Sequence, residues 1–288
     1  MMNYQSATLA EYGYKEHKVL KTIWKISKYF LLFITILGLY LPIIIIAIQS
    51  LNTSTDAANF QGFTIHWYTH MFDNRSLTES IKNTFLISLS ATLASTVLGT
   101  LIAIGINYLP AKVKQKIMLI NNIPLLNADI VTGVSLMLLF SLLLPLFPHI
   151  FGFTTLFLAY LFFTLPYIIL SVLPKFKECD PNLMDAAMDL GMKPFKAALN
   201  VLVPAVKSGI FSGAILAFTI SFEDFVVSYF TTGNGFDTLS IWLYSSKGKN
   251  SLTPSVYAFN TIIVLGSIVL IVLYQLLIKG GKKHAKKH

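Results

Sequence analysis

Charged residues are scarce in this 288-residue chain. They make up 12% of it, whereas hydrophobic residues make up 55%, and a soluble domain typically carries about 25% charged residues. This composition excludes a soluble globular enzyme, and it excludes a disordered basic tail, which would need low hydrophobicity. The few charges are also unbalanced, with 22 Lys and Arg against 13 Asp and Glu. The cations lie in short clusters between long apolar runs, whereas a nucleic-acid binder would gather them on one face.

Cysteine is nearly absent, and the common catalytic motifs are missing. The single cysteine, Cys179, cannot form an intramolecular disulfide and has no second thiol for a metal or redox motif. The sequence contains no G-x-x-x-x-G-K-[ST] phosphate loop, no H-E-x-x-H pair and no G-x-S-x-G turn. We therefore expect no catalytic site, cofactor or metal in this chain. If it moves a solute uphill, the energy comes from a partner or from an ion gradient.

Long apolar runs are what the sequence does contain. A membrane-spanning helix needs about 20 mostly apolar residues, and uncharged stretches of that length recur along the chain. We predict an all-α membrane protein with six transmembrane helices, over residues 29–49, 82–108, 117–144, 152–173, 208–230 and 255–278. The first run is too long for the core of a cleavable signal peptide. Between the third and fourth helices, Pro145, Pro148 and Gly152 predict a tight turn.

The lysines orient the predicted helices. With both termini in the cytoplasm, 18 of the 22 basic residues lie on the cytoplasmic side, as the positive-inside rule requires. This predicts a cytoplasmic N-terminal segment over 1–28, a transmembrane domain over 29–278 and a basic cytoplasmic tail over 279–288. The charges of that tail suit contact with anionic lipid headgroups. The excess of positive charge therefore indicates how the chain is oriented in the membrane, with its lysines on the cytoplasmic side.

The longest predicted cytoplasmic loop, residues 174–207, has the pattern of two short helices. The first helix is predicted to have Asp180 as its N-cap and Pro181 in its first turn. Gly191 is predicted to end it in a left-handed conformation. Pro194 then starts a second helix, which Pro204 ends. Small alanines in the first helix allow another surface to approach closely. The alternative is an amphipathic loop that packs under the bundle and has no partner.

This loop resembles the EAA signature of ABC importer permeases. The motif begins with Asp185 in place of the usual Glu, and a glycine, a phenylalanine and a Val-Pro pair follow at the family's spacing. The resemblance implies the type I (MetI-like) importer permease fold, two separate ATPase subunits that bind ATP and Mg, and a second homologous permease. The residues that it assigns to ATPase coupling are Asp185, Ala186, Ala187, Gly191, Phe195 and Pro204.

Acidic residues inside the predicted membrane helices are the second unusual feature. There are three of them, Asp129, Glu223 and Asp224. A charged side chain in the hydrocarbon core costs about 2.5–3.5 kcal/mol on insertion scales, and the spans hold no base to pair with them. Pro124, Asn127 and Gly133 predict local unwinding around Asp129, which is tolerated where backbone lines a cavity. We expect these acids to face a wet pathway and to attract an external cation. The alternative is that they hydrogen-bond to backbone or to a partner subunit.

The surroundings of these acids resemble the C-type permease of spermidine/putrescine importers. The similar stretches include residues 62–68, 127–140 and 221–239, and the resemblance covers about residues 29–278. Glu223 stands where that family more often has Asp, and Ala128 where it often has Pro. The resemblance implies ATP-driven import of a linear polycation across the bacterial inner membrane, delivered by an extracytoplasmic polyamine-binding protein. The expected pathway residues are Asp129, Glu223, Asp224 and Tyr229, with Phe225 and Phe230 as further cation–π candidates.

Other functions stay open on the sequence. An ABC permease for another solute, such as an iron, thiamine or phosphonate compound, would share the coupling loop, although the acids argue against anionic cargo. An ion-coupled secondary transporter would use the acids as a proton or sodium relay, but it predicts inverted repeats that the sequence does not show. A structural or sensory membrane subunit would not need buried acids. The sequence does not separate spermidine from putrescine.

Overall fold

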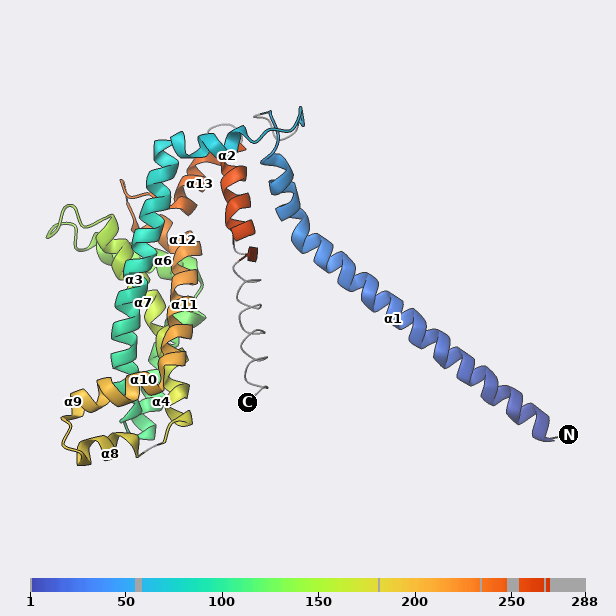
Figure 1. Ribbon diagram of the computed structural model, residues 1–288, viewed down its shortest axis with the longest axis horizontal. Coiled ribbons are helices and arrows are strands. Elements are labelled where there is room, and N and C mark those ends of the chain that lie inside the picture. The colour runs from blue at the N-terminus through green and yellow to red at the C-terminus, as the bar shows by residue number, and fades with distance from the viewer. Residues whose placement is uncertain are drawn as a thin grey trace, which may run out of the picture. The chain divides into compact units, whose positions relative to one another are not determined.

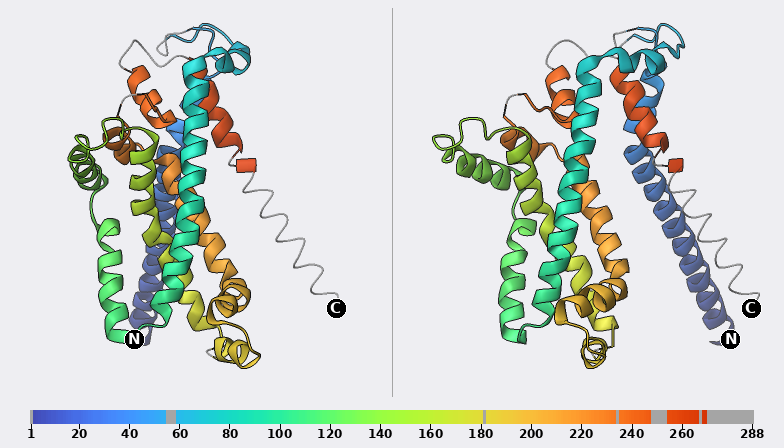
Figure 2. Two further views of the ribbon diagram at one scale, coloured as in Figure 1. Left: turned by 90° about the vertical axis from the view of Figure 1, so that its left-hand side faces the viewer. Right: turned by 60° about the vertical axis from the view of Figure 1, so that its left-hand side comes forward.

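The computed structural model describes residues 2–54, 59–180, 182–233, 235–247, 254–266 and 268–269. Within these ranges the regular structure is helical, and the one β-bridge is an isolated pair between Asn52 and Phe63. The all-α prediction is confirmed. The chain divides into two compact units, residues 1–71 with 251–288, and residues 72–250. The second unit holds every predicted site residue, and its helices are seen in Figures 1 and 2.

The first unit contains one long helix, α1 (Met2–Gln49). It begins well before residue 29, where the sequence predicts the first membrane helix, because the preceding segment has no proline and a single glycine to interrupt it. Its apolar part, Trp24–Gln49, is long enough to span a bilayer. The unit also contains α2 (His66–His70), which leads into η1 (Met71–Asp73), and the helix Pro254–Gly266. Residues 270–278 of the last predicted helix and the tail 279–288 lie outside the described residues.

Three helices form the centre of the second unit: α3 (Arg75–Asn107), α7 (Phe153–Val172) and α11 (Lys207–Glu223). Each packs against the other two. Glycines allow this approach, since a Cβ added to Gly99 of α3 would lie 2.7 Å from Ile168 of α7, and one added to Gly213 of α11 would lie 3.2 Å from the same residue. On the outside of this trio, α13 (Leu239–Lys247) packs on α3.

The third predicted membrane helix is broken. It consists of α4 (Ala111–Asn121), α5 (Ile123–Leu126) and α6 (Asp129–Ser141), with extended backbone at Asn127 and Ala128. The unwinding predicted beside Asp129 is confirmed. The turn predicted after this helix is also confirmed, because Gly152 has a φ of 128° immediately before α7.

The fifth predicted helix is broken as well, so the continuous helix expected over 208–230 is wrong. It divides at Asp224 into α11 and α12 (Val226–Thr231). α12 packs against α6, and this contact needs the glycine in α6. A Cβ on Gly133 would lie 3.1 Å from the ring of Phe230 and 3.4 Å from Cα of Val227. The two short helices thus form a pair beside α7.

Three helices among the described residues are long and apolar enough to cross a bilayer: the apolar part of α1, α3, and α7 with its continuation η2 (Leu173–Glu178). A fourth is added if α11 is joined to the bent segment Pro194–Ala205 before it. α6 and the helix Pro254–Gly266 are apolar but shorter. The chain is a multi-pass membrane protein, whereas six crossings and cytoplasmic termini stay predictions.

Candidate functional site

The loop over 174–207 folds into two short helical segments at the lysine-rich end of the second unit (Figure 1). The first, α8 (Leu183–Asp189), ends at Gly191, whose φ of 85° is the left-handed conformation predicted for it. The N–H of Gly191 donates to the carbonyl of Met188 at 2.8 Å, and the N–H of Met192 donates to that of Ala187 at 3.2 Å. These two bonds define a Schellman motif, which fixes the turn between the segments.

The start of α8 differs from the prediction. Asn182, rather than Asp180, occupies the N-cap position, and its side chain makes no capping hydrogen bond. Asp180 instead forms a turn that leads into the helix. Its carboxylate accepts the N–H of Asn182 at 2.9 Å, and its carbonyl accepts the N–H of Leu183 at 3.2 Å. Pro181, predicted for the first helical turn, lies outside the described residues.

The second segment is continuous from Pro194 to Ala205. It comprises α9 (Pro194–Ala197), the π-helical η3 (Ala198–Leu202) and α10 (Val203–Ala205). The segment ends at Ala205, one residue after Pro204, where the sequence predicts its end. A π-helical turn within this segment was not predicted. The chain then bends by 75° into α11.

The two faces of this loop (residues 174–207), which we call the coupling loop after its predicted role, have different surroundings. Its buried side chains join one hydrophobic cluster with α3, α7 and α11; they include Met184, Ala187, Ala197 and Leu202. The opposite face is exposed and includes Asp185, Ala186, Phe195 and Pro204. Leu190 is 82% exposed and Phe195 is 68% exposed. The loop is thus anchored in the bundle on one face and presents large apolar side chains on the other.

Asp224 lies in the break between α11 and α12, where it is hydrogen-bonded. Its carboxylate accepts the N–H groups of Val227 at 3.2 Å and Ser228 at 2.8 Å. It also accepts the hydroxyl of Tyr160, a buried residue of α7, at 3.3 Å. The carboxylate therefore caps the first turn of α12, where the helix dipole also favours negative charge. Hydrogen bonding to backbone, one of the two readings open from the sequence, applies to this acid.

The other two acids are exposed and form no hydrogen bond or ion pair with any described residue. Glu223 is the last residue of α11, and Asp129 is the first of α6. Two tyrosines of α7 interact with this region. Tyr160 donates its hydroxyl to Asp224, the neighbour of Glu223, and Tyr167 interacts electrostatically with Asp129. These tyrosines are two turns apart on one face of α7, about 10 Å along its axis.

An aromatic cluster lies beside these acids. It contains Phe225, Tyr229, Phe230 and Tyr244. The ring centroids of Phe225 and Tyr244 are 4.9 Å apart, and those of Tyr229 and Tyr244 are 5.6 Å apart. With Ile130, the neighbour of Asp129, these rings line a cavity of about 200 Å³. Sequence reasoning missed Tyr244, since it lies in α13 and only tertiary packing brings it to Tyr229.

The described residues contain no group of three or more His, Cys, Asp or Glu side chains that could hold a metal ion. The site instead combines exposed carboxylates with aromatic faces at two helix breaks. Such a combination attracts cations, since ammonium groups bind both carboxylates and the faces of aromatic rings. Broken helices that line a cavity are a common way for membrane transport proteins to build a solute site.

An all-helical membrane unit with broken helices that line a cavity is typical of membrane transport proteins. The comparison with known families agrees: the chain matches the model of the binding-protein-dependent transport system inner membrane component over residues 95–282. The chain belongs to this family. It is therefore a multi-pass permease of the bacterial inner membrane, and the matched span includes the coupling loop and all three acids.

Relatives of known function narrow the class. The spermidine/putrescine transport system permease protein PotC of Escherichia coli K12 is 31% identical over 246 residues, which cover 85% of this chain and 91% of the relative. PotC of Haemophilus influenzae Rd is 32% identical over 256 residues, with 87% and 97% covered. The putrescine transport system permease protein PotI of E. coli K12 is 29% identical over 253 residues, with 87% and 88% covered.

A solved structure confirms the fold. The chain is similar to a chain in the crystal structure of a bacterial ABC transporter involved in the import of the acidic polysaccharide alginate, with a TM-score of 0.64. The match covers 89% of this chain and 96% of the other at 15% identity. The ABC importer permease fold implied by the EAA-like loop is thereby confirmed.

Proposed function

We propose that this chain is a permease subunit of an ATP-driven importer of polyamines and forms half of the translocation pathway. A cationic cargo is supported by one observation: two exposed carboxylates, Glu223 and Asp129, lie with the aromatic cluster at the helix breaks. Polyamines are linear polycations, so several ammonium groups need negative or aromatic partners at successive points. The names of the relatives support the same cargo class.

We propose an order of contact from the two tyrosines of α7 that interact with these acids. α7 runs from Phe153 toward the lysine-rich end, so Tyr160 lies about 10 Å and Tyr167 about 20 Å from its start. A polyamine entering from the opposite, outer side meets Glu223 and Asp224 first and Asp129 second. Tyr229, which is half exposed, holds an ammonium group through its ring face.

Energy is proposed to come from two ATPase subunits, which bind ATP and Mg and contact the exposed face of the coupling loop. Phe195 and Leu190 enter a groove of the ATPase, with Asp185 and Ala186 beside them. Closure of the ATPase pair moves α8, and the hydrophobic cluster passes that movement to α3, α7 and α11. A second homologous permease completes the pathway, and an extracytoplasmic polyamine-binding protein delivers the cargo.

The test is uptake of radiolabelled spermidine and putrescine by vesicles that contain the chain with its partner subunits and binding protein. We expect ATP-dependent accumulation, and we expect Glu223→Gln combined with Asp129→Asn to lower it at least tenfold. The matched control is Asp73→Asn combined with Asp237→Asn, which removes two exposed acids outside the helix breaks. Accumulation without ATP, or import of a different solute class only, would contradict the proposal.

A further inference from the structure

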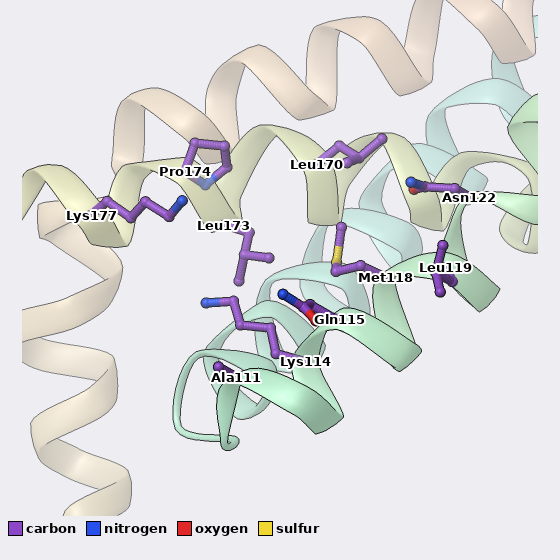
Figure 3. Close-up of a pocket in the computed structure, with 10 residues that line it drawn as sticks. All are labelled: Ala111, Lys114, Gln115, Met118, Leu119, Asn122, Leu170, Leu173, Pro174 and Lys177. Carbon is purple, nitrogen blue, oxygen red and sulfur yellow. The ribbon is translucent and has the colours of Figure 1, made fainter.

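A groove opens between α4 and the end of α7, in a part of the second unit that the transport site does not use (Figure 3). Its volume is about 670 Å³, within the roughly 300–1,000 Å³ of small-molecule sites. One wall comes from α4 and includes Lys114, Met118 and Leu119. The other comes from α7 and η2 and includes Leu170, Leu173 and Lys177. α4 packs mainly on α3 and α5, so the groove separates it from α7.

The polarity of the groove changes along its length. Figure 3 shows Lys114 and Lys177 on opposite walls at one end, with Leu119 and Leu170 farther along. The same change occurs in both walls of the sequence: α4 is lysine-rich up to Lys116 and apolar afterwards, and the other wall is apolar through Leu173 and lysine-rich afterwards. In both walls of the groove, lysines therefore give way to apolar residues at the same level. We expect this level to lie at the membrane interface, where lysines extend their ammonium groups toward the headgroups.

The two lysines have no acidic partner among the described residues. Lys175, which does not line the groove, shows the contrast because its ammonium group pairs with Glu178 at 2.9 Å. Lys114 is half-buried and Lys177 is exposed, and neither forms an ion pair with a described residue. A cationic polyamine is repelled from this end. An anion with a long apolar tail satisfies both the lysines and the apolar walls.

We propose that the groove binds an anionic phospholipid from the cytoplasmic leaflet. Its phosphate lies between the ammonium groups of Lys114 and Lys177, and an acyl chain follows Leu119 and Leu170 along the groove. Basic pockets between membrane helices on the cytoplasmic side are known to take such headgroups. Met118 faces the groove and also packs on the hydrophobic cluster that anchors the coupling loop. A bound lipid therefore stabilises the end of the bundle on which that loop rests.

The test uses the purified permease complex after delipidation, with phosphatidylglycerol and phosphatidylcholine as probes. We expect phosphatidylglycerol to raise the thermal unfolding temperature and phosphatidylcholine to have little effect. In Lys114→Ala combined with Lys177→Ala, the phosphatidylglycerol concentration for half the effect should rise about tenfold to thirtyfold. The matched control, Lys112→Ala combined with Lys116→Ala, removes the same charge from exposed positions outside the groove and should respond as the wild type does.

Location is tested with phosphatidylglycerol that carries a photoactivatable acyl chain. We expect the label on peptides that contain Met118, Leu119 or Leu170. Three results would overturn the proposal: equal phosphatidylglycerol midpoints in the groove variant and its control, equal protection by inorganic phosphate, or efficient crosslinking of Leu119→Cys to the second permease, which would show that protein covers the groove. The proposal holds for any cargo, so its failure would leave polyamine transport unaffected.

Discussion

Asp224 combines two roles that a single substitution can separate. Its carboxylate caps α12 and accepts the hydroxyl of Tyr160, yet it also lies in the proposed pathway. Asp224→Asn keeps one acceptor oxygen for the cap, and it removes the charge together with the second acceptor oxygen. We predict a smaller loss of thermal stability of the purified complex than alanine causes at this position, and a fall in polyamine uptake of about tenfold.

The comparison variant for this residue is Asp224→Ala. It removes the cap as well and should lower the free energy of unfolding by about 0.5–2 kcal/mol. If Asp224→Asn transports polyamines at the wild-type rate, the carboxylate serves the helix break alone.

Gly191 is the residue on which the shape of the coupling loop depends. Its φ of 85° is unfavourable for a residue with a side chain, although no atom lies within 4 Å of an added Cβ. Gly191→Ala should therefore cost about 1–2 kcal/mol through backbone strain alone. We predict a loss of transport coupled to ATP hydrolysis, measured as uptake per ATP hydrolysed.

Gly105→Ala is the matched control for that experiment. Gly105 lies within α3 and also has open space around an added Cβ, so alanine there should be neutral or slightly stabilising. Equal coupling in both variants would show that the left-handed turn is not needed.

At the scale of elements, α3 carries a row of hydroxyls along its buried face. Ser88, Thr92, Thr96 and Thr100 recur every fourth residue, and their hydroxyls are buried without a protein partner among the described residues. Thr84, one turn earlier, is different, because it donates to Ser80 and accepts the N–H of Leu239. Unpaired buried hydroxyls destabilise a fold, whereas apolar replacements of the same shape are neutral or stabilising.

We predict that Thr92→Val raises the free energy of unfolding by up to about 1 kcal/mol, and that Thr84→Val lowers it by about 1–2 kcal/mol because it leaves a buried N–H unpaired. Thermal unfolding of the purified complex measures both. If Thr92→Val is as damaging as Thr84→Val, the Thr92 hydroxyl has a partner outside this chain.

Local signals explain which helix breaks could be predicted. The break at Asn127 and Ala128 follows from Pro124 and from polar residues within an apolar run. The break at Asp224 has no proline or glycine beside it, and its only signal is the pair of acids, Glu223 and Asp224, within an apolar run. In the coupling loop, the Gly191 stop was predictable because it depends on one residue. The π-helical turn Ala198–Leu202 was not predictable, because no single residue marks it.

At the scale of the whole molecule, the distribution of charged residues along the sequence predicts the orientation of the chain in the membrane. It does not predict which residues contact one another in the fold. Tyr244 and the groove beside α4 both depend on tertiary packing between segments far apart in the chain. The predicted orientation itself can be tested with the single cysteine. Cys179 is half-buried in the coupling loop and donates its thiol to the carbonyl of Lys175.

We predict that a membrane-impermeant maleimide labels Cys179 in inside-out vesicles and not in intact cells whose outer membrane has been permeabilised. Asp237→Cys in a Cys179→Ser background is the opposite control, since residue 237 is exposed and is predicted to lie in an outer loop. Labelling of Cys179 from the outside would reverse the assigned topology.

The anchoring of α8 restricts how the bundle can respond to its neighbours. Met184 and Ala187 are packed with Ile168 and Val172 of α7 and with Ala103 of α3 in one close-packed cluster. Such interiors do not deform continuously, and they change by switching between discrete packings. A substitution that loosens this cluster should therefore not slow the cycle smoothly. It should let intermediate packings persist, so that the complex leaks cargo and hydrolyses ATP without import.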